Sequence, residues 1–147
     1  MRKLILMLAV FSGILISCDA KKTTSDATNN PELLNGSWEV NYIALTTMAI
    51  NDLYRDKKPF ISFNVKESKV SGNTGCNSFT GNISSMSGGE IRFDESMAMT
   101  RMFCEGGGEN IFVENMKVVE RFSFSDDGKT LHLTGKDGKD AIRLTKK

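Results

Sequence analysis

Two cysteines, Cys76 and Cys104, are the side chains of this sequence that could take part in the widest range of reactions. In an oxidising compartment, an even pair of thiols usually forms a disulfide, and we expect these two to bond to each other. The same thiols would also suit a reactive thiol pair or metal ligation. The sequence leaves those two alternatives open.

Three methionines, Met97, Met99 and Met102, come shortly before Cys104. Thioether and thiolate groups are ligands that suit Cu(I), and alternation along a strand would place Met97 and Met99 on one face. Methionine is also an ordinary core filler. We therefore assign no metal site and no cofactor, and keep copper binding through this segment as an alternative.

His132 is the only histidine, and it lies between Leu131 and Leu133. It has no cysteine or acidic neighbour in the sequence, so we expect a solvent-facing strand residue. A single histidine without a serine elbow argues against a hydrolase triad, and no carboxylate spacing suggests a glycosidase. We predict no catalytic residue and no enzymatic activity.

The N-terminus has the pattern of a secretory signal. Arg2 and Lys3 form a basic region, and the apolar stretch 4–16 is too short to span a bilayer comfortably. The run that ends at Cys18, Leu15-Ile16-Ser17-Cys18, resembles the lipobox of bacterial lipoproteins, which a signal peptidase cuts before the cysteine once it carries a diacylglycerol. We predict a signal peptide over 1–17 and lipidation at Cys18, which would attach the chain to a membrane of the bacterial cell envelope. The alternatives are an ordinary signal with an incidental cysteine and an uncleaved anchor.

Length and charge limit the remaining possibilities. The chain has 147 residues, 39% of them hydrophobic, which suits one domain with one core. Residues 18–32 are polar and predict a flexible tether, which leaves 33–147 for the domain. Loss of Arg2 and Lys3 from 19 basic residues leaves 17 against 18 acidic ones, a net charge of −1. Nucleic acid is therefore not an expected partner.

Short alternating runs separated by turn residues predict antiparallel strands. The expected strands are 37–43, 60–65, 69–73, 82–85 and 90–93, followed by three more that contain Phe122 and Phe124, Leu131 and Leu133, and 141–145. One amphipathic helix is expected over 110–121, and 44–55 is ambiguous between a short helix and a loop. The predicted fold is α+β, with a curved antiparallel sheet or partial barrel packed by one main α-helix.

Two separated motifs resemble the META domain family, to which the bacterial heat-shock lipoprotein HslJ belongs. The matching residues are Gly72, Thr74, Gly75, Cys76, Asn77, Phe79 and Gly81, then Thr100, Arg101, Met102 and Cys104, with Glu109 and Phe112 opening the helix and Trp38 on the first strand. The resemblance covers about 33–147. It implies a β-rich lipid-anchored or secreted domain without established enzymatic activity, linked in some members to stress or drug tolerance.

The glycine-rich motif allows two interpretations. Its glycines and Asn77 suit a tight structural turn, and the same residues would suit a binding loop. No lysine follows them as a phosphate loop requires. We expect a non-enzymatic envelope protein that supports stress or drug tolerance by binding an unidentified protein or small ligand.

Overall fold

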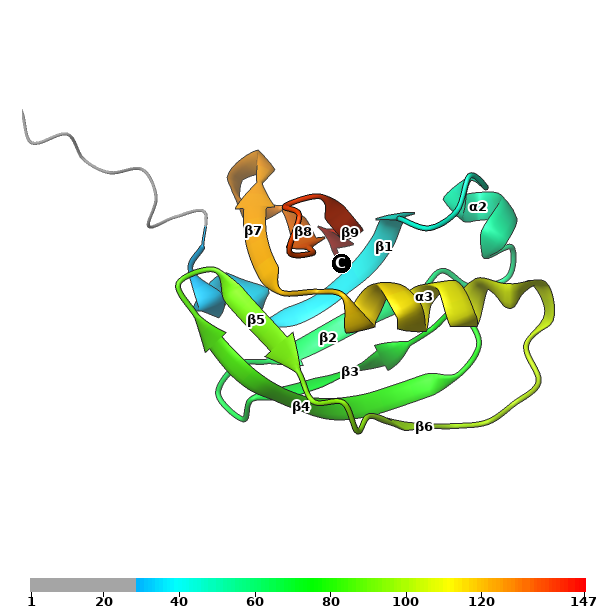
Figure 1. The fold of residues 1–147 in the computed structure, drawn as a ribbon, viewed down its shortest axis with the longest axis horizontal. Coiled ribbons are helices and arrows are strands. Elements are labelled where there is room, and N and C mark those ends of the chain that lie inside the picture. Colours follow the sequence, from blue (N-terminus) through cyan, green and yellow to red (C-terminus); the bar gives the residue numbers. More distant parts are fainter. Residues whose placement is uncertain (1–28) are drawn as a thin grey trace, which may run out of the picture.

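The computed structural model describes residues 29–147 (Figure 1). The predicted signal peptide 1–17, the lipidation site Cys18 and the tether as far as residue 28 lie outside the described residues. The elements are η1 (Pro31–Leu34), β1 (Gly36–Ile43), α2 (Ile50–Leu53), β2 (Phe60–Asn64), β3 (Lys69–Asn73), β4 (Ser78–Ser87), β5 (Glu90–Phe93), β6 (Ala98–Met99), η2 (Glu105–Gly107), α3 (Gly108–Lys117), β7 (Arg121–Ser125), η3 (Asp126–Gly128), β8 (Thr130–Thr134) and β9 (Asp140–Lys146).

The strands form one antiparallel sheet whose ends meet. Its order is β3-β2-β1-β9-β8-β7-β5-β4-β6, and an additional β3–β4 pairing closes it into a ring. The ring is weakest between β5 and β7, which share only the pair Glu90 and Arg121. The helix α3 packs against β1 and β9. The predicted α+β class, with a curved antiparallel sheet and one main helix, is confirmed.

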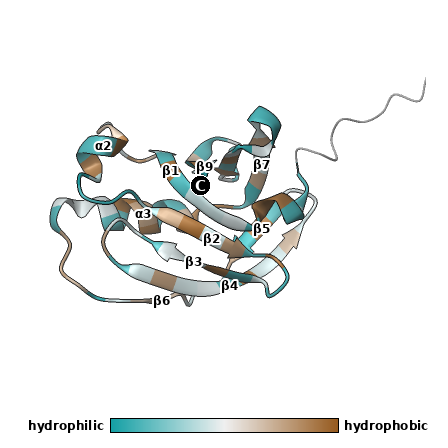
Figure 2. Ribbon diagram, turned by 180° about the vertical axis from the view of Figure 1, so that it is seen from behind, coloured by the Kyte–Doolittle hydropathy of each residue, from teal (hydrophilic) through white to brown (hydrophobic). Residues whose placement is uncertain are grey.

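The core lies inside this ring because the strands alternate apolar and polar residues. Figure 2 shows brown bands separated by white and teal ones along the ribbons. Trp38 on β1 is fully buried, and its indole nitrogen donates to the carbonyl of Leu34 at 2.7 Å. Phe112 and Met116 on α3 are buried in the same core. No helix among residues 29–147 is long and apolar enough to span a membrane.

Two predicted elements have different bounds in the structure. The predicted strand 82–85 is part of the longer β4, since Gly81, which resembles a turn residue, lies within the strand. A Cβ on Gly81 would lie 2.7 Å from Met97 Cγ, so the glycine serves close packing. The predicted helix 110–121 begins at Gly108 and ends at Lys117, because Arg121 already pairs in β7.

The short helices α2 and η1 lie in two segments for which the sequence predicted no definite helix. The ambiguous segment 44–55 contains α2 within a longer connection. The 3-10 helix η1 begins at Pro31, inside the segment predicted as tether, and Asn30 caps it by accepting from the Glu32 amide at 3.0 Å. Pro31 and Glu32, which the sequence analysis assigned to the tether, thus lie in a folded element.

Gly72 provides a test of this packing. It lies on β3 between β2 and β4, and a Cβ there would collide with the backbone oxygen of Phe60 and lie 2.9 Å from the ring of Phe79. We expect Gly72→Ala to lower the free energy of unfolding by about 2 kcal/mol, because neither neighbour is free to move. Urea denaturation would measure it. The control is Gly135→Ala, whose Cβ would meet its nearest atoms at 3.4 Å; equal losses in both variants would contradict the steric explanation.

Candidate functional site

The side-chain amide of Asn77 lies at the centre of the motif region and is fully buried. Its nitrogen donates to the carbonyl of Met102 at 3.0 Å and to Glu109 Oε2 at 2.8 Å. Its oxygen accepts from Thr100 Oγ1 at 2.7 Å and from the Met102 amide at 2.8 Å. One amide thus joins the β3–β4 turn to the segment after β6 and to the first turn of α3.

Thr74 completes the turn around Asn77. Its side chain is fully buried, and its hydroxyl lies 2.8 Å from Glu109 Oε2. The same hydroxyl accepts a hydrogen bond from the backbone N–H of Asn77 at 3.0 Å. The Thr74 amide donates to the Asn77 carbonyl at 2.8 Å. Glu109 is in the first turn of α3, where the helix dipole favours a negative charge. The turn and the helix therefore hold the same carboxylate between them.

Cys76 and Cys104 are joined in the disulfide that the sequence predicted. Their Cα atoms are 6.0 Å apart, and the bond links the β3–β4 turn to the residue before η2. Asn77 Nδ2 lies 3.0 Å from Cys104 Sγ. In this state neither sulfur is available as a thiolate for catalysis or metal binding.

Tyr54, which the sequence analysis did not single out, packs between two glycines. A Cβ on Gly75 would lie 2.5 Å from the ring of Tyr54, and a Cβ on Gly108 would lie 2.7 Å from it. The hydroxyl donates to the Gly108 carbonyl at 2.7 Å. Burial raises the pKa of Tyr54, which keeps the phenol protonated as a donor. No local pattern marks this residue, because its partners are far away in the chain.

These contacts show how the glycine-rich motif packs. Protein atoms fill the space beside Gly72, Gly75 and Gly81, where side chains would otherwise stand. Thr74 and Asn77 use their polar atoms on neighbouring protein groups. The motif therefore builds a close-packed turn, and three of its residues, Thr74, Gly75 and Cys76, also line a pocket.

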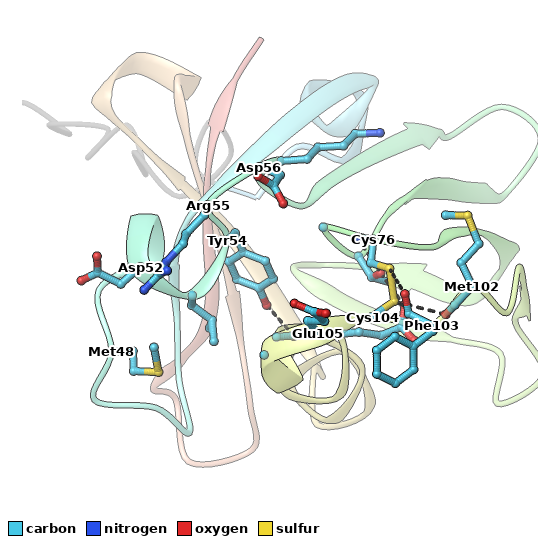
Figure 3. A pocket seen from close by; sticks show the side chains of 17 residues that line it. Met48, Asp52, Tyr54, Arg55, Asp56, Cys76, Met102, Phe103, Cys104 and Glu105 are labelled. Carbon is cyan, nitrogen blue, oxygen red and sulfur yellow. Dashed lines mark hydrogen bonds between the residues drawn. A yellow bond between two sulfur atoms is a disulfide. The ribbon is translucent and has the colours of Figure 1, made fainter.

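A pocket of about 720 Å³ opens on the outer side of this turn (Figure 3). The disulfide, Tyr54 and the residues following α2 line it, and three exposed apolar side chains stand at its edge, Phe103 (90% exposed), Met102 (61%) and Met48 (51%). Both charge signs occur around it, with Asp52, Asp56 and Glu105 against Arg55 and Lys57. Arg101 is exposed and is not among the lining residues.

The structure separates the methionines that were considered as soft-metal ligands. Met97 and Met99 line a second pocket of about 710 Å³ together with Met116. Met102 lines the first pocket, and Cys104 is in the disulfide. The four sulfur groups of this segment are therefore not brought to one point.

His132 has partners that the sequence analysis did not anticipate. Its Nδ1 lies 3.0 Å from Asp140 Oδ1, and its Nε2 lies 2.9 Å from Ser125 Oγ. His132 lies on a strand as expected, and although it has no acidic neighbour in the sequence, antiparallel pairing of β8 with β7 and β9 brings Ser125 and Asp140 to it. The imidazole is 23% exposed. None of the three residues lines either pocket.

The buried amide gives a sharp test. Asn77→Asp would place a second carboxylate 2.8 Å from Glu109 Oε2. We expect a loss of about 3 kcal/mol in the free energy of unfolding at neutral pH, because an unpaired buried charge faces a like charge. Part of the lost stability should return in acid, because a protonated carboxyl group can donate a hydrogen bond to its neighbour. Urea denaturation at two pH values would measure this.

The matched control for that substitution is Asn82→Asp. Asn82 Nδ2 also donates to a carboxylate, Asp94 Oδ2 at 3.1 Å, but in an exposed position. We expect a loss below about 1 kcal/mol there, because water screens the pair. A similar loss at both positions would mean that burial of Asn77 has no special effect.

Comparison with known proteins agrees with this architecture. The structure is similar to the NMR structure of a protein from Burkholderia xenovorans (TM-score 0.61, 18% identity, covering 100% of this chain and 99% of that one). It is also similar to the crystal structure of a DUF4847 family protein from Bacteroides vulgatus (TM-score 0.51, 12% identity, covering 78% and 94%). At these identities the likeness shows the fold alone.

A search of curated proteins finds no match to this sequence. The sequence model of the META domain, in contrast, matches residues 31–147, which include both motifs, the disulfide and the helix α3. The chain belongs to the META domain family.

Proposed function

We propose that this META domain protein is a lipid-anchored component of the bacterial cell envelope. In this proposal the domain is a non-enzymatic binding module that supports envelope stress or drug tolerance. The anchor is Cys18, and the binding surface is the pocket edge formed by Met48, Met102 and Phe103.

The observation that carries the proposal is the exposure of Phe103. This aromatic side chain is 90% exposed, follows the apolar Met102, and precedes a disulfide-bonded cysteine that fixes the backbone. An exposed apolar group on a rigid backbone is a feature of binding surfaces. Charged residues of both signs around the pocket supply a polar rim. This chemistry suits a partner that buries an apolar group in the pocket and pairs charges at its edge.

The position of the chain entry supports the same assignment. Figure 1 shows η1 at the end of the molecule opposite to α2 and to the loop that leads into α3. The described domain thus begins at the end of the molecule opposite to the loop that carries Phe103.

The serine, histidine and aspartate on β7, β8 and β9 do not change the non-enzymatic assignment. An oxyanion next to Ser125 would need hydrogen-bond donors, but the Asp126 carboxylate lies 3.5 Å from Ser125 Oγ. That charge opposes the negative charge of a tetrahedral intermediate. Arg143 Nη1 also lies 3.7 Å from Asp140 Oδ2 and competes with the imidazole for the carboxylate.

Reaction with a fluorophosphonate tests that assignment. We expect Ser125 to stay unmodified, because it lies beside an acidic group and outside both pockets. Intact-mass measurement after incubation would show this, with a serine hydrolase labelled in parallel as the positive control. A phosphonate adduct on Ser125 that disappears in His132→Ala would instead establish an activated nucleophile.

Complementation of a deletion strain tests the anchor and the surface together. Under drugs, heat and detergent, we expect the wild-type gene to restore tolerance, while Cys18→Ala and Phe103→Ser fail to do so. The membrane-extracted wild-type protein should carry a lipid increment on a chain that begins at Cys18, as measured by intact mass. Val118→Ser is the control, because Val118 is also apolar and 50% exposed but lies at the end of α3, outside the lining of either pocket.

Three outcomes would contradict the proposal. A deletion strain without any stress phenotype would refute the role in tolerance. An unlipidated chain would refute the anchor. Full complementation by Phe103→Ser would show that binding does not depend on this pocket edge.

A further inference from the structure

We propose that reduction of the Cys76–Cys104 disulfide turns the wall of the first pocket into a Zn²⁺ site. Its protein ligands would be the two thiolates and the carboxylate of Glu109. This inference is independent of the proposed envelope function, since it concerns the chemistry of three side chains.

The three donors are already gathered. The Sγ atoms of Cys76 and Cys104 and a carboxylate oxygen of Glu109 all lie within 4.8 Å of one another. Glu109 Oε2 is 3.5 Å from Cys104 Sγ. In a tetrahedral zinc site, with Zn–S near 2.3 Å and Zn–O near 2.0 Å, a sulfur and an oxygen ligand are separated by about 3.5 Å. The carboxylate therefore stands at ligand distance before any metal arrives.

The surroundings of Glu109 are those of a metal-ligating carboxylate. Thr74 Oγ1 and Asn77 Nδ2 each lie 2.8 Å from Oε2 and fix the orientation of the group. Oε2, which these two donors hold, is also the oxygen that lies 3.5 Å from Cys104 Sγ, while within residues 29–147 Oε1 forms no hydrogen bond with the protein. Ligands held in this way by a second layer of hydrogen bonds need little rearrangement on binding.

The pocket supplies the rest of the site. Cys76, Cys104 and Glu109 all line it and are partly exposed, so a cation has a path from solvent. The open side leaves the fourth position to water, as in zinc sites with three protein ligands. Two thiolates and one carboxylate suit Zn²⁺ better than the hard cations Mg²⁺ and Ca²⁺, which prefer oxygen alone.

A dithiol can act as the reductant of the Cys76–Cys104 disulfide. The dithiol transfers two electrons, its own sulfurs form a disulfide, and Cys76 and Cys104 become two thiols. Binding of one Zn²⁺ then displaces the two thiol protons. A disulfide oxidant accepts the two electrons and takes up two protons to become a dithiol, which re-forms the Cys76–Cys104 bond and releases the metal, so the site exists only in the reduced chain.

Zinc titration of the oxidised and reduced full-length protein tests the inference. After reduction with a phosphine under anaerobic conditions, competition with a chromophoric zinc chelator should show one bound Zn²⁺ per chain, and the disulfide-bonded protein should bind none. Co²⁺ in place of Zn²⁺ should give thiolate-to-metal charge-transfer absorption in the reduced protein alone. Zinc should also raise the Tm of the reduced chain, because it binds the folded state.

Glu109→Gln distinguishes a zinc site with three protein ligands from zinc binding by the two thiolates alone. We expect it to weaken zinc binding by about tenfold or more, since it removes one protein ligand. Glu105→Gln should bind as the wild type does, because Glu105 lines the same pocket but is not part of the donor cluster. Equal affinity of Glu109→Gln and wild type, equal binding in both redox states, or no binding by the reduced chain would each overturn the inference.

Discussion

The hydrogen-bonding requirement of one buried amide organises this end of the domain. A primary amide removed from water must find acceptors for its two N–H groups and donors for its oxygen. Asn77 satisfies both sides through Thr100, Met102 and Glu109. Asn115, a buried residue on α3, is less complete, since its side-chain oxygen has no hydrogen-bond partner among the described residues. The contrast shows how fully the Asn77 site is built.

The remaining features of the site follow from this requirement. To bring Asn77 against Glu109, the β3–β4 turn must approach α3 closely, and Gly75 and Gly108 allow this by making room for the ring of Tyr54. The disulfide then holds the same two segments covalently. While the disulfide is intact, the groups most exposed to solvent around the pocket are therefore Phe103 and the charged side chains.

The sequence predicted most strands because burial alternates along them with period two. Leu131 and Leu133, and Phe122 and Phe124, are buried as their spacing requires. The helix end was misplaced because Val119 continues the helical spacing and is buried, although the backbone has already left the helix. The length of β4 was missed because a glycine that permits close packing resembles one that permits a turn.

The candidate site was predictable only in part. The cysteine pairing follows from the number of thiols that remain once Cys18 is assigned to lipidation, and it needs no geometry. The bond between Asn77 and Glu109 joins residues 32 positions apart, and the bond from Tyr54 to Gly108 spans 54 positions. The partners of His132 depend on strand register, including an irregularity between Leu133 and Thr134 that brings Thr134 opposite Asp140. Such contacts are consequences of the tertiary fold, and local spacing carries no trace of them.

The segment between β5 and α3 connects the site to the exposed surface. It contains only the two-residue strand β6 and the short η2, so few backbone hydrogen bonds hold it. Its main attachments around Met102 and Phe103 are the amide of Asn77 and the disulfide at Cys104. The sheet itself closes without this segment, through β3, β4 and the single pair between β5 and β7. A change at Cys76 and Cys104 would therefore alter the support of Phe103 while leaving the ring of strands intact, so the redox state of one bond and the position of this exposed side chain are physically coupled.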